Sequence, residues 1–156
     1  MEYQGKYDHF FLTNVSQKLV ELIERNADEL TASWLADVKK NSRTPTYQAF
    51  NEKDLYQRAF KVYSQLGKWL SRDTSSEEIR NYWASLGRER RKENFALSEV
   101  IHAVALLRRH LWNKVQAEGL LDSAYDLFQA MELYNQVMLF FDWAIYYSAV
   151  GYESEG

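Results

Sequence analysis

Cysteine is absent from the chain, and proline and glycine are scarce, with one proline and six glycines in 156 residues. Without cysteine there is no disulfide, no thiolate metal site and no cysteine nucleophile. So few glycines and prolines favour long helices over a sheet protein with many tight turns. The length fits one domain, which we expect to span residues 1–156, with a loosely ordered N-terminus over 1–13 and a C-terminal tail over 151–156.

The chain also lacks a large charge of either sign. Its 19 basic and 22 acidic side chains leave a formal net charge of -3. Such a chain has no overall field that attracts nucleic acid or an anionic membrane, so we expect neither as a partner. The first residues, MEYQGKYDHFF, have no basic start followed by an apolar run, and we therefore expect no secretion signal and a cytoplasmic protein.

Apolar residues recur every three or four positions along most of the chain, and no segment alternates with a period of two. This periodicity predicts five helices. They cover roughly residues 15–40, 52–70, 76–93, 98–118 and 122–150. The sequence therefore predicts an all-α, single-domain five-helix bundle, and globin-like packing is one arrangement that it allows.

The fifth segment is unusually apolar, because fifteen of the twenty residues from 133 to 152 are hydrophobic. Asp142 in its middle and the absence of basic flanks argue against a membrane span. A helix that is apolar nearly all round must be covered on more than one side. We expect one stripe to face the core, namely Met138, Phe141 and Ile145. We predict that a second stripe forms a homodimer interface, although a central position in the bundle is the alternative: Leu133, Val137, Phe140, Ala144 and Tyr147.

Asp142 is the acidic residue that this pattern singles out, since its neighbours one turn away are apolar. A buried carboxylate needs a cation or several donors, and the candidates are Arg88, Arg90 and Arg108. We predict a structural ion pair rather than a ligand-sensing acid. The candidate buried polar or ligand-sensing site consists of four residues: Asp142, Arg108, Arg90 and His102.

Glu99 and His102 form a Glu-x-x-His pair, the spacing that places two ligands on one helix face in di-iron bundles. Such a site requires a second pair of this kind on a facing helix, and the sequence contains none. A solvated helix face is therefore the favoured interpretation, and a metal-dependent bundle enzyme that uses these two residues is the alternative. We expect no metal and no cofactor.

The charged run RERRKE over residues 88–93 reads as the last turns of the third helix, where cations are favoured by the exposed carbonyl groups. Asn94 suits the left-handed conformation that ends many helices. Phe95 and Leu97 can then pack against the core. The run is thus interpreted as a helix–helix corner rather than an anion site.

The corner contains Gly87, Arg90, Phe95, Leu97 and Glu99, and the helix after it contains Leu107, Arg108, Arg109, Leu111 and Trp112. In these residues the chain resembles the N-terminal domain of bacterial stressosome co-antagonists of the RsbRD type. The resemblance extends to Trp34, Pro45, Tyr47, Leu55, Arg58, Leu66 and Trp69. Asn94 and Ala96 stand where that family tends to have glycine and proline.

The resemblance implies a sensory or regulatory input domain and supplies no catalytic residue. Members are usually joined to an output module, and we expect none in this chain, which would then be either a free-standing member or one whose output lies on another chain. We therefore expect a non-catalytic protein-interaction module of bacterial signal transduction, which forms a homodimer and contacts a signalling protein.

Overall fold

The computed structural model describes residues 14–71, 73–118 and 123–154, and this part of the chain contains eight helices and no strand. The helices are α2 (Asn14–Arg25), α3 (Ala27–Lys40), α4 (Pro45–Ala49), α5 (Glu52–Ser64), α6 (Leu66–Trp69), α7 (Ser76–Lys92), α8 (Leu97–Ala117) and α9 (Ala124–Glu153). The all-α fold is confirmed, and the predicted number of five helices is wrong.

Two predicted helices are each divided in the structure. The backbone leaves helical geometry at Asn26, with φ −106° and ψ 21°, and the Asn26 side chain donates a hydrogen bond to the Leu22 carbonyl oxygen at 2.7 Å. The backbone also leaves helical geometry at Gln65, with φ −117° and ψ 25°, and this separates α5 from α6. A third difference is α4, which begins at Pro45 inside a segment predicted as a loop. Proline is favoured in the first turn because its missing N–H has no helical acceptor there.

Two helix starts lie where the sequence predicts them. Asn51 Oδ1 accepts a hydrogen bond from the Asp54 backbone N–H at 2.9 Å, which caps α5. Ser75 Oγ accepts one from the Glu78 N–H at 3.1 Å, which caps α7. Each cap satisfies a donor that has no partner within its own helix.

The longest helix, α9, continues through Gly151 to Glu153, so its predicted end at residue 150 is wrong. Gly151 does not end the helix but lies where α9 crosses α7. A Cβ atom there would fall on the carbonyl oxygen of Ala84, and one on Gly87 of α7 would fall on the carbonyl oxygen of Ser148. Glycine therefore allows the α7 and α9 backbones to touch. None of the described helices, α9 included, qualifies as a candidate membrane span.

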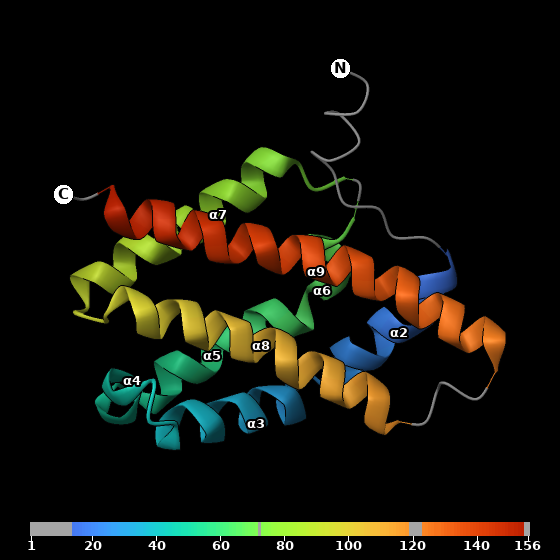
Figure 1. Ribbon diagram of the computed structural model, residues 1–156, viewed down its shortest axis with the longest axis horizontal. Helices are drawn as coiled ribbons and strands as arrows, with labels where there is room; N and C mark the ends of the chain where they lie inside the picture. Colours follow the sequence, from blue (N-terminus) through green and yellow to red (C-terminus); the bar gives the residue numbers. More distant parts are fainter. Residues whose placement is uncertain (1–13, 72, 119–122, 155–156) are drawn as a thin grey trace.

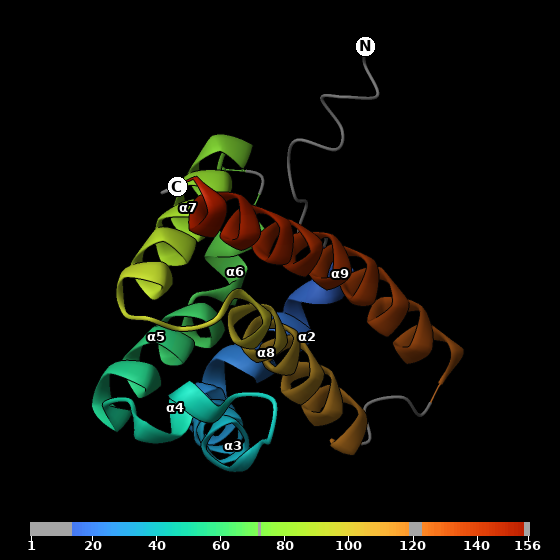
Figure 2. The same cartoon turned by 60° about the vertical axis from the view of Figure 1, so that its left-hand side comes forward.

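The helices form layers that Figures 1 and 2 both show: α9 lies along one long side, α3 along the opposite side, and α8 between them. The closest pair is α7 and α9. In Figure 1, α7 lies beside the red C-terminal half of α9, whereas the orange N-terminal half extends toward the other end of the molecule. The two halves of α9 therefore have different surroundings.

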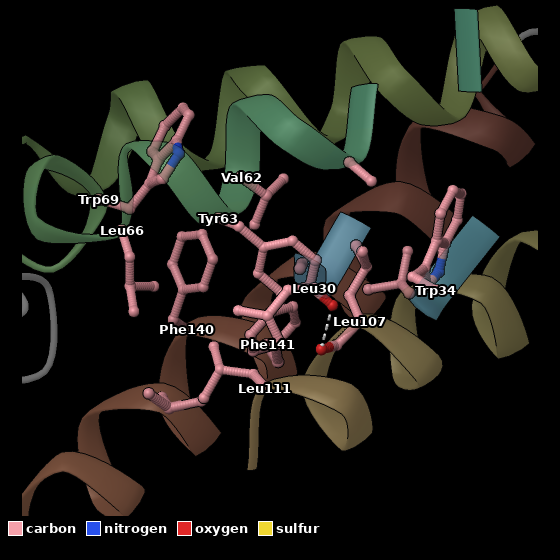
Figure 3. Close-up of a cluster of buried hydrophobic side chains, with 14 of the residues drawn as sticks. Leu30, Trp34, Val62, Tyr63, Leu66, Trp69, Leu107, Leu111, Phe140 and Phe141 are labelled. Atoms are coloured by element: carbon pink, nitrogen blue, oxygen red, sulfur yellow. Dashed lines mark hydrogen bonds between the residues drawn. The ribbon is translucent and has the colours of Figure 1, made fainter. Parts of the chain in front are cut away.

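Aromatic side chains fill much of the core, as Figure 3 shows. Among the largest fully buried side chains are Tyr63, Phe140 and Phe141. Tyr63 Oη donates to the Leu107 carbonyl oxygen at 2.7 Å, and Trp34 Nε1 donates to the Ala103 carbonyl oxygen at 2.9 Å. These bonds satisfy two buried donors, which would otherwise weaken the core.

Candidate functional site

The chain turns sharply between α7 and α8, at a corner formed by residues 90–97. Asn94 has a φ of 69°, the left-handed conformation predicted for it. The Phe95 N–H donates to the Arg90 carbonyl oxygen at 3.0 Å, and the buried Phe95 ring lies 4.4 Å from Tyr47. The predicted corner is confirmed, except that α8 begins at Leu97, one residue earlier than expected.

The charged run ends in an ion-pair cluster. The Glu93 carboxylate accepts hydrogen bonds from Arg58 at 2.7 and 3.0 Å and from Arg90 at 2.5 Å. Burial raises the pKa of Glu93, but the Arg58 hydrogen bond and the charge of Arg90 outweigh it, so the pKa lies below its ordinary value. The cluster ties α5 to the end of α7, and Arg90, a predicted site residue, belongs to it.

Glu99 is buried, so the solvated helix face predicted for it is wrong, and both of its carboxylate oxygens accept hydrogen bonds. It accepts hydrogen bonds from the Thr46 N–H at 2.6 Å, the Thr46 hydroxyl at 2.7 Å and the Ala96 N–H at 3.2 Å. His102, one turn along α8, is half-buried. In the described residues no group of three or more His, Cys, Asp or Glu side chains could hold a metal ion. Glu99 therefore joins α4 to the start of α8.

Asp142 is exposed, with 63% of its side chain accessible to water, so its predicted burial is wrong. Its carboxylate lies 3.9 Å from Arg108 Nη1, and Arg108 is one of the three predicted partners. Arg90 pairs with Glu93 instead. The predicted four-residue polar site is therefore not assembled around a buried Asp142.

The stripe predicted as a homodimer interface lies inside the molecule. Four of its members are buried core residues: Leu133, Val137, Phe140 and Ala144. Tyr147 is partly buried and packs against the same core. These residues contact other helices of their own chain, and their assignment to an intermolecular surface is wrong.

A different face of α9 is exposed instead, and the sequence analysis missed it. Its side chains are large and apolar, and between 41% and 64% of each is accessible: Tyr125, Leu127, Phe128, Met131 and Tyr134. We call these five residues the α9 face. Single exposed apolar residues are ordinary, but a contiguous group of large ones is typical of an interaction site.

A shallow groove of about 240 Å³ borders the α9 face, where α8 meets α9. Trp112 of α8 packs edge-on against Tyr134, with the ring centroids 5.0 Å apart. Arg108 and Arg109 line the groove, and Arg109 is exposed. The α9 face thus has a basic rim at this end, while Asp126 lies in the first turn at the other end of the exposed segment.

Comparison with known families gives one match: the family model of the RsbT co-antagonist protein rsbRD N-terminal domain covers residues 25–156. The match includes seven of the eight described helices completely, α3 to α9. Comparison with curated proteins gives no match, and neither does comparison with solved structures.

Proposed function

The chain belongs to the family of RsbT co-antagonist protein rsbRD N-terminal domains, and from this premise we propose that it is a non-catalytic sensory or regulatory module that works through protein contacts. The family is one of stressosome-related signalling domains, which supports a role in bacterial signal transduction. The observation that carries the proposal is the α9 face, because it is the kind of surface by which proteins recognise one another.

The occupant that we propose for the α9 face is a second copy of this chain. Tyrosine, phenylalanine and methionine are enriched in protein interfaces, and four of the five residues of the α9 face are of these types. An interface about a two-fold axis must be complementary to itself. Leu127, Met131, Tyr134 and Met138 form one stripe along α9, so two copies of α9 can pack antiparallel with Met131 near the axis.

The charges around the α9 face suit the same arrangement. Antiparallel packing brings the basic rim of one copy, at Arg108 and Arg109, toward Asp126 of the other copy. Opposite charges across an interface fix its register and favour one orientation over the reverse. A parallel arrangement would place the arginines of both copies at the same end.

The mass of the protein in solution tests this proposal, measured by sedimentation equilibrium over a range of concentrations. We expect a dimer for the natural chain and a monomer for Met131→Glu, because the interface would then bury an unpaired carboxylate. The control is Tyr146→Glu, which introduces the same group on the same helix. Tyr146 is 61% exposed and Met131 59%, but Tyr146 lies outside the α9 face. A natural chain that stays monomeric, or a control that dissociates equally, would contradict the dimer.

The alternative of a metal-dependent enzyme that uses Glu99 and His102 has no observation in its favour. Both carboxylate oxygens of Glu99 already accept hydrogen bonds. The cytoplasmic location, the signalling partner and the globin-like packing stay predictions.

A further inference from the structure

A groove of about 780 Å³ opens between α5 and α7, on a different part of the molecule from the α9 face. These two helices are not among the closely packed pairs, and long side chains bridge them. Lys61 of α5 lies over the Tyr82 ring of α7, 5.1 Å from its centroid, and Arg58 reaches Glu93. A volume of this size lies within the range of roughly 300–1,000 Å³ that is typical of small-molecule sites.

A second, smaller pocket of about 40 Å³ lies behind the groove. Arg58, Leu86 and Arg90 line both, so the pocket is the inner end of the groove. Most of its other walls are apolar or aromatic, with Trp83 and Val104 among them. It has room for about three water-sized groups, enough for the end of an alkyl chain or the edge of a ring.

Arg90 is the more deeply buried of the two arginines at the junction, and of its side-chain nitrogens only Nη1 bonds to a described residue. Only 5% of its side chain is accessible, and it donates through Nη1 to Glu93. Its Nε and Nη2 make no hydrogen bond to another described residue, and neither atom belongs to the fully buried donors that lack a partner. Arg58 already occupies both oxygens of Glu93, so two guanidinium groups share one carboxylate. A largely buried guanidinium that keeps donors for a ligand suits a planar anion.

Other donors in the walls also lack acceptors. Trp83 lines the inner pocket and Trp69 lines the groove, and the Nε1 atom of each is buried with no hydrogen-bond partner among the described residues. The remaining charged side chains of the groove largely balance one another: Lys61, Lys68, Asp54, Glu78 and Glu89. All five are exposed, where water and salt weaken their fields.

We propose that this groove binds a small molecule with one carboxylate and an apolar body. The carboxylate pairs with the guanidinium of Arg90, and the apolar body lies against Leu86 and enters the inner pocket. Carboxylate is favoured because its two oxygens match the fork of N–H donors on arginine. The inference deepens the proposed sensory role by naming the class of stimulus, and it does not depend on the dimer.

The position of Arg90 connects the groove to the end of α9. Its neighbour Arg91 donates to the Tyr152 carbonyl oxygen at 2.8 Å, and Tyr152 Oη donates to the Phe95 carbonyl oxygen at 2.6 Å. The last turn of α9 is therefore held by the same corner that contains Arg90 and Glu93. A ligand that weakens the contact of Arg90 with Glu93 would therefore act on the corner that holds the last turn of α9.

Isothermal titration calorimetry with phenylacetate and hexanoate, and with 2-phenylethanol as the neutral counterpart of phenylacetate, tests the proposal. We expect both carboxylates to bind and the alcohol to bind at least about tenfold more weakly, the effect of one lost charge-assisted hydrogen bond. Leu86→Trp fills the groove without changing any charge and should weaken phenylacetate binding by a similar factor.

Glu93→Gln makes the sharper test, because it predicts a gain. Removal of the internal carboxylate frees both arginines, so phenylacetate should bind more tightly by about tenfold. Met131→Glu is the control that separates the two proposals: it should abolish the dimer and leave phenylacetate binding unchanged. If neither carboxylate binds, if the alcohol binds equally well, or if folded Leu86→Trp binds as the natural chain does, the proposed site is wrong.

Discussion

Glu99 shows at the scale of one residue how a buried charge is kept in this fold. Its carboxylate accepts three hydrogen bonds, two from Thr46 and one from Ala96, and two of the three donors are backbone N–H groups. Hydrogen bonds to a charged group are roughly twice as strong as neutral ones. Ala96 has no side-chain acceptor for the first turn of α8, so Glu99 also anchors the start of that helix.

Glu99→Ala should lower the free energy of unfolding by about 2–3 kcal/mol, since it leaves buried donors without an acceptor. Urea denaturation followed by circular dichroism measures the change. Asp142→Asn is the comparison, because it removes an exposed carboxylate with one long ion pair and should cost less than about 0.5 kcal/mol. Equal effects of the two substitutions would mean that the hydrogen bonds of Glu99 do not stabilise the fold.

Acid should destabilise the protein through Glu93 and Asp37. For Asp37, burial raises the pKa, but hydrogen bonds from His110 and Asn41 outweigh it and leave the pKa below its ordinary value of 3.8. Glu93 likewise lies below its ordinary value of 4.5. A carboxyl group whose pKa is lower in the folded state than in the unfolded state stabilises the folded protein. This contribution is complete when the pH is above the ordinary pKa, and it is lost as the pH falls through the folded pKa.

The free energy of unfolding should therefore fall as the pH decreases from above 4.5 to below the folded pKa values of both groups. Urea denaturation at a series of pH values measures this slope. Glu93→Gln and Asp37→Asn should each make the slope shallower. A stability that is level or rises with acid would contradict the hydrogen bonds described for Asp37 and the ion pairs described for Glu93.

Local chemistry made several residues predictable from the sequence. The caps at Asn51 and Ser75 and the left-handed Asn94 follow from the bonds that each side chain makes with its own neighbours. Asp142 was not predictable in this way. Its neighbours along α9 are apolar, but which side of such a helix faces water is decided by the helices packed against it.

At the scale of the helices, both apolar stripes predicted on α9 lie against the core, since Phe141 is buried and Ile145 packs against the core, as do Phe140 and Ala144 of the other stripe. The buried face contains small residues where it meets α7, including Ala144, Ser148 and Gly151, and small residues let helix backbones approach closely. Large residues cover the opposite face in the N-terminal half. Small residues therefore mark the crossing with α7, but side-chain size does not separate buried from exposed positions along the rest of α9, because Phe140 and Phe141 are fully buried.

Gly151→Ala tests this crossing, because its Cβ would overlap a backbone oxygen that cannot move independently of α7. We expect a loss of about 3 kcal/mol or more, at the upper end of the usual range for overpacking. Gly67→Ala is the matched control in α6. Its Cβ meets the flexible Glu24 carboxylate at 3.0 Å, and alanine favours a helix more than glycine does. Thermal or urea unfolding measures the stability of both variants. A mild effect of Gly151→Ala would refute the close approach of the α7 and α9 backbones.

The helix breaks at Asn26 and Gln65 show where periodicity stops being informative. The apolar stripe Leu19, Ile23, Ala27, Leu30, Trp34 and Val38 keeps helical spacing across Asn26, and all six residues are buried. A change of axis between two helices that bury the same stripe leaves no trace in the spacing. Only the side-chain bond from Asn26 to Leu22 marks the position.

At the scale of the whole molecule, α9 divides the proposed roles between its two halves. Its C-terminal half crosses α7 and is held by the corner that borders the α5–α7 groove. Its N-terminal half carries the α9 face. One continuous helix of 30 residues therefore links the proposed ligand site to the proposed dimer interface. Such a connection suits a domain in which a bound ligand alters contacts between proteins.

The most direct test of the dimer uses the absence of cysteine from the natural chain. Met131→Cys places one thiol near the proposed two-fold axis, and Tyr146→Cys places one at a similarly exposed position outside the α9 face. Mild oxidation followed by non-reducing gel electrophoresis measures covalent dimer formation. The antiparallel dimer predicts rapid cross-linking of Met131→Cys that greatly exceeds that of Tyr146→Cys. Equal and slow cross-linking of both variants would contradict the α9 face as the site where two copies meet.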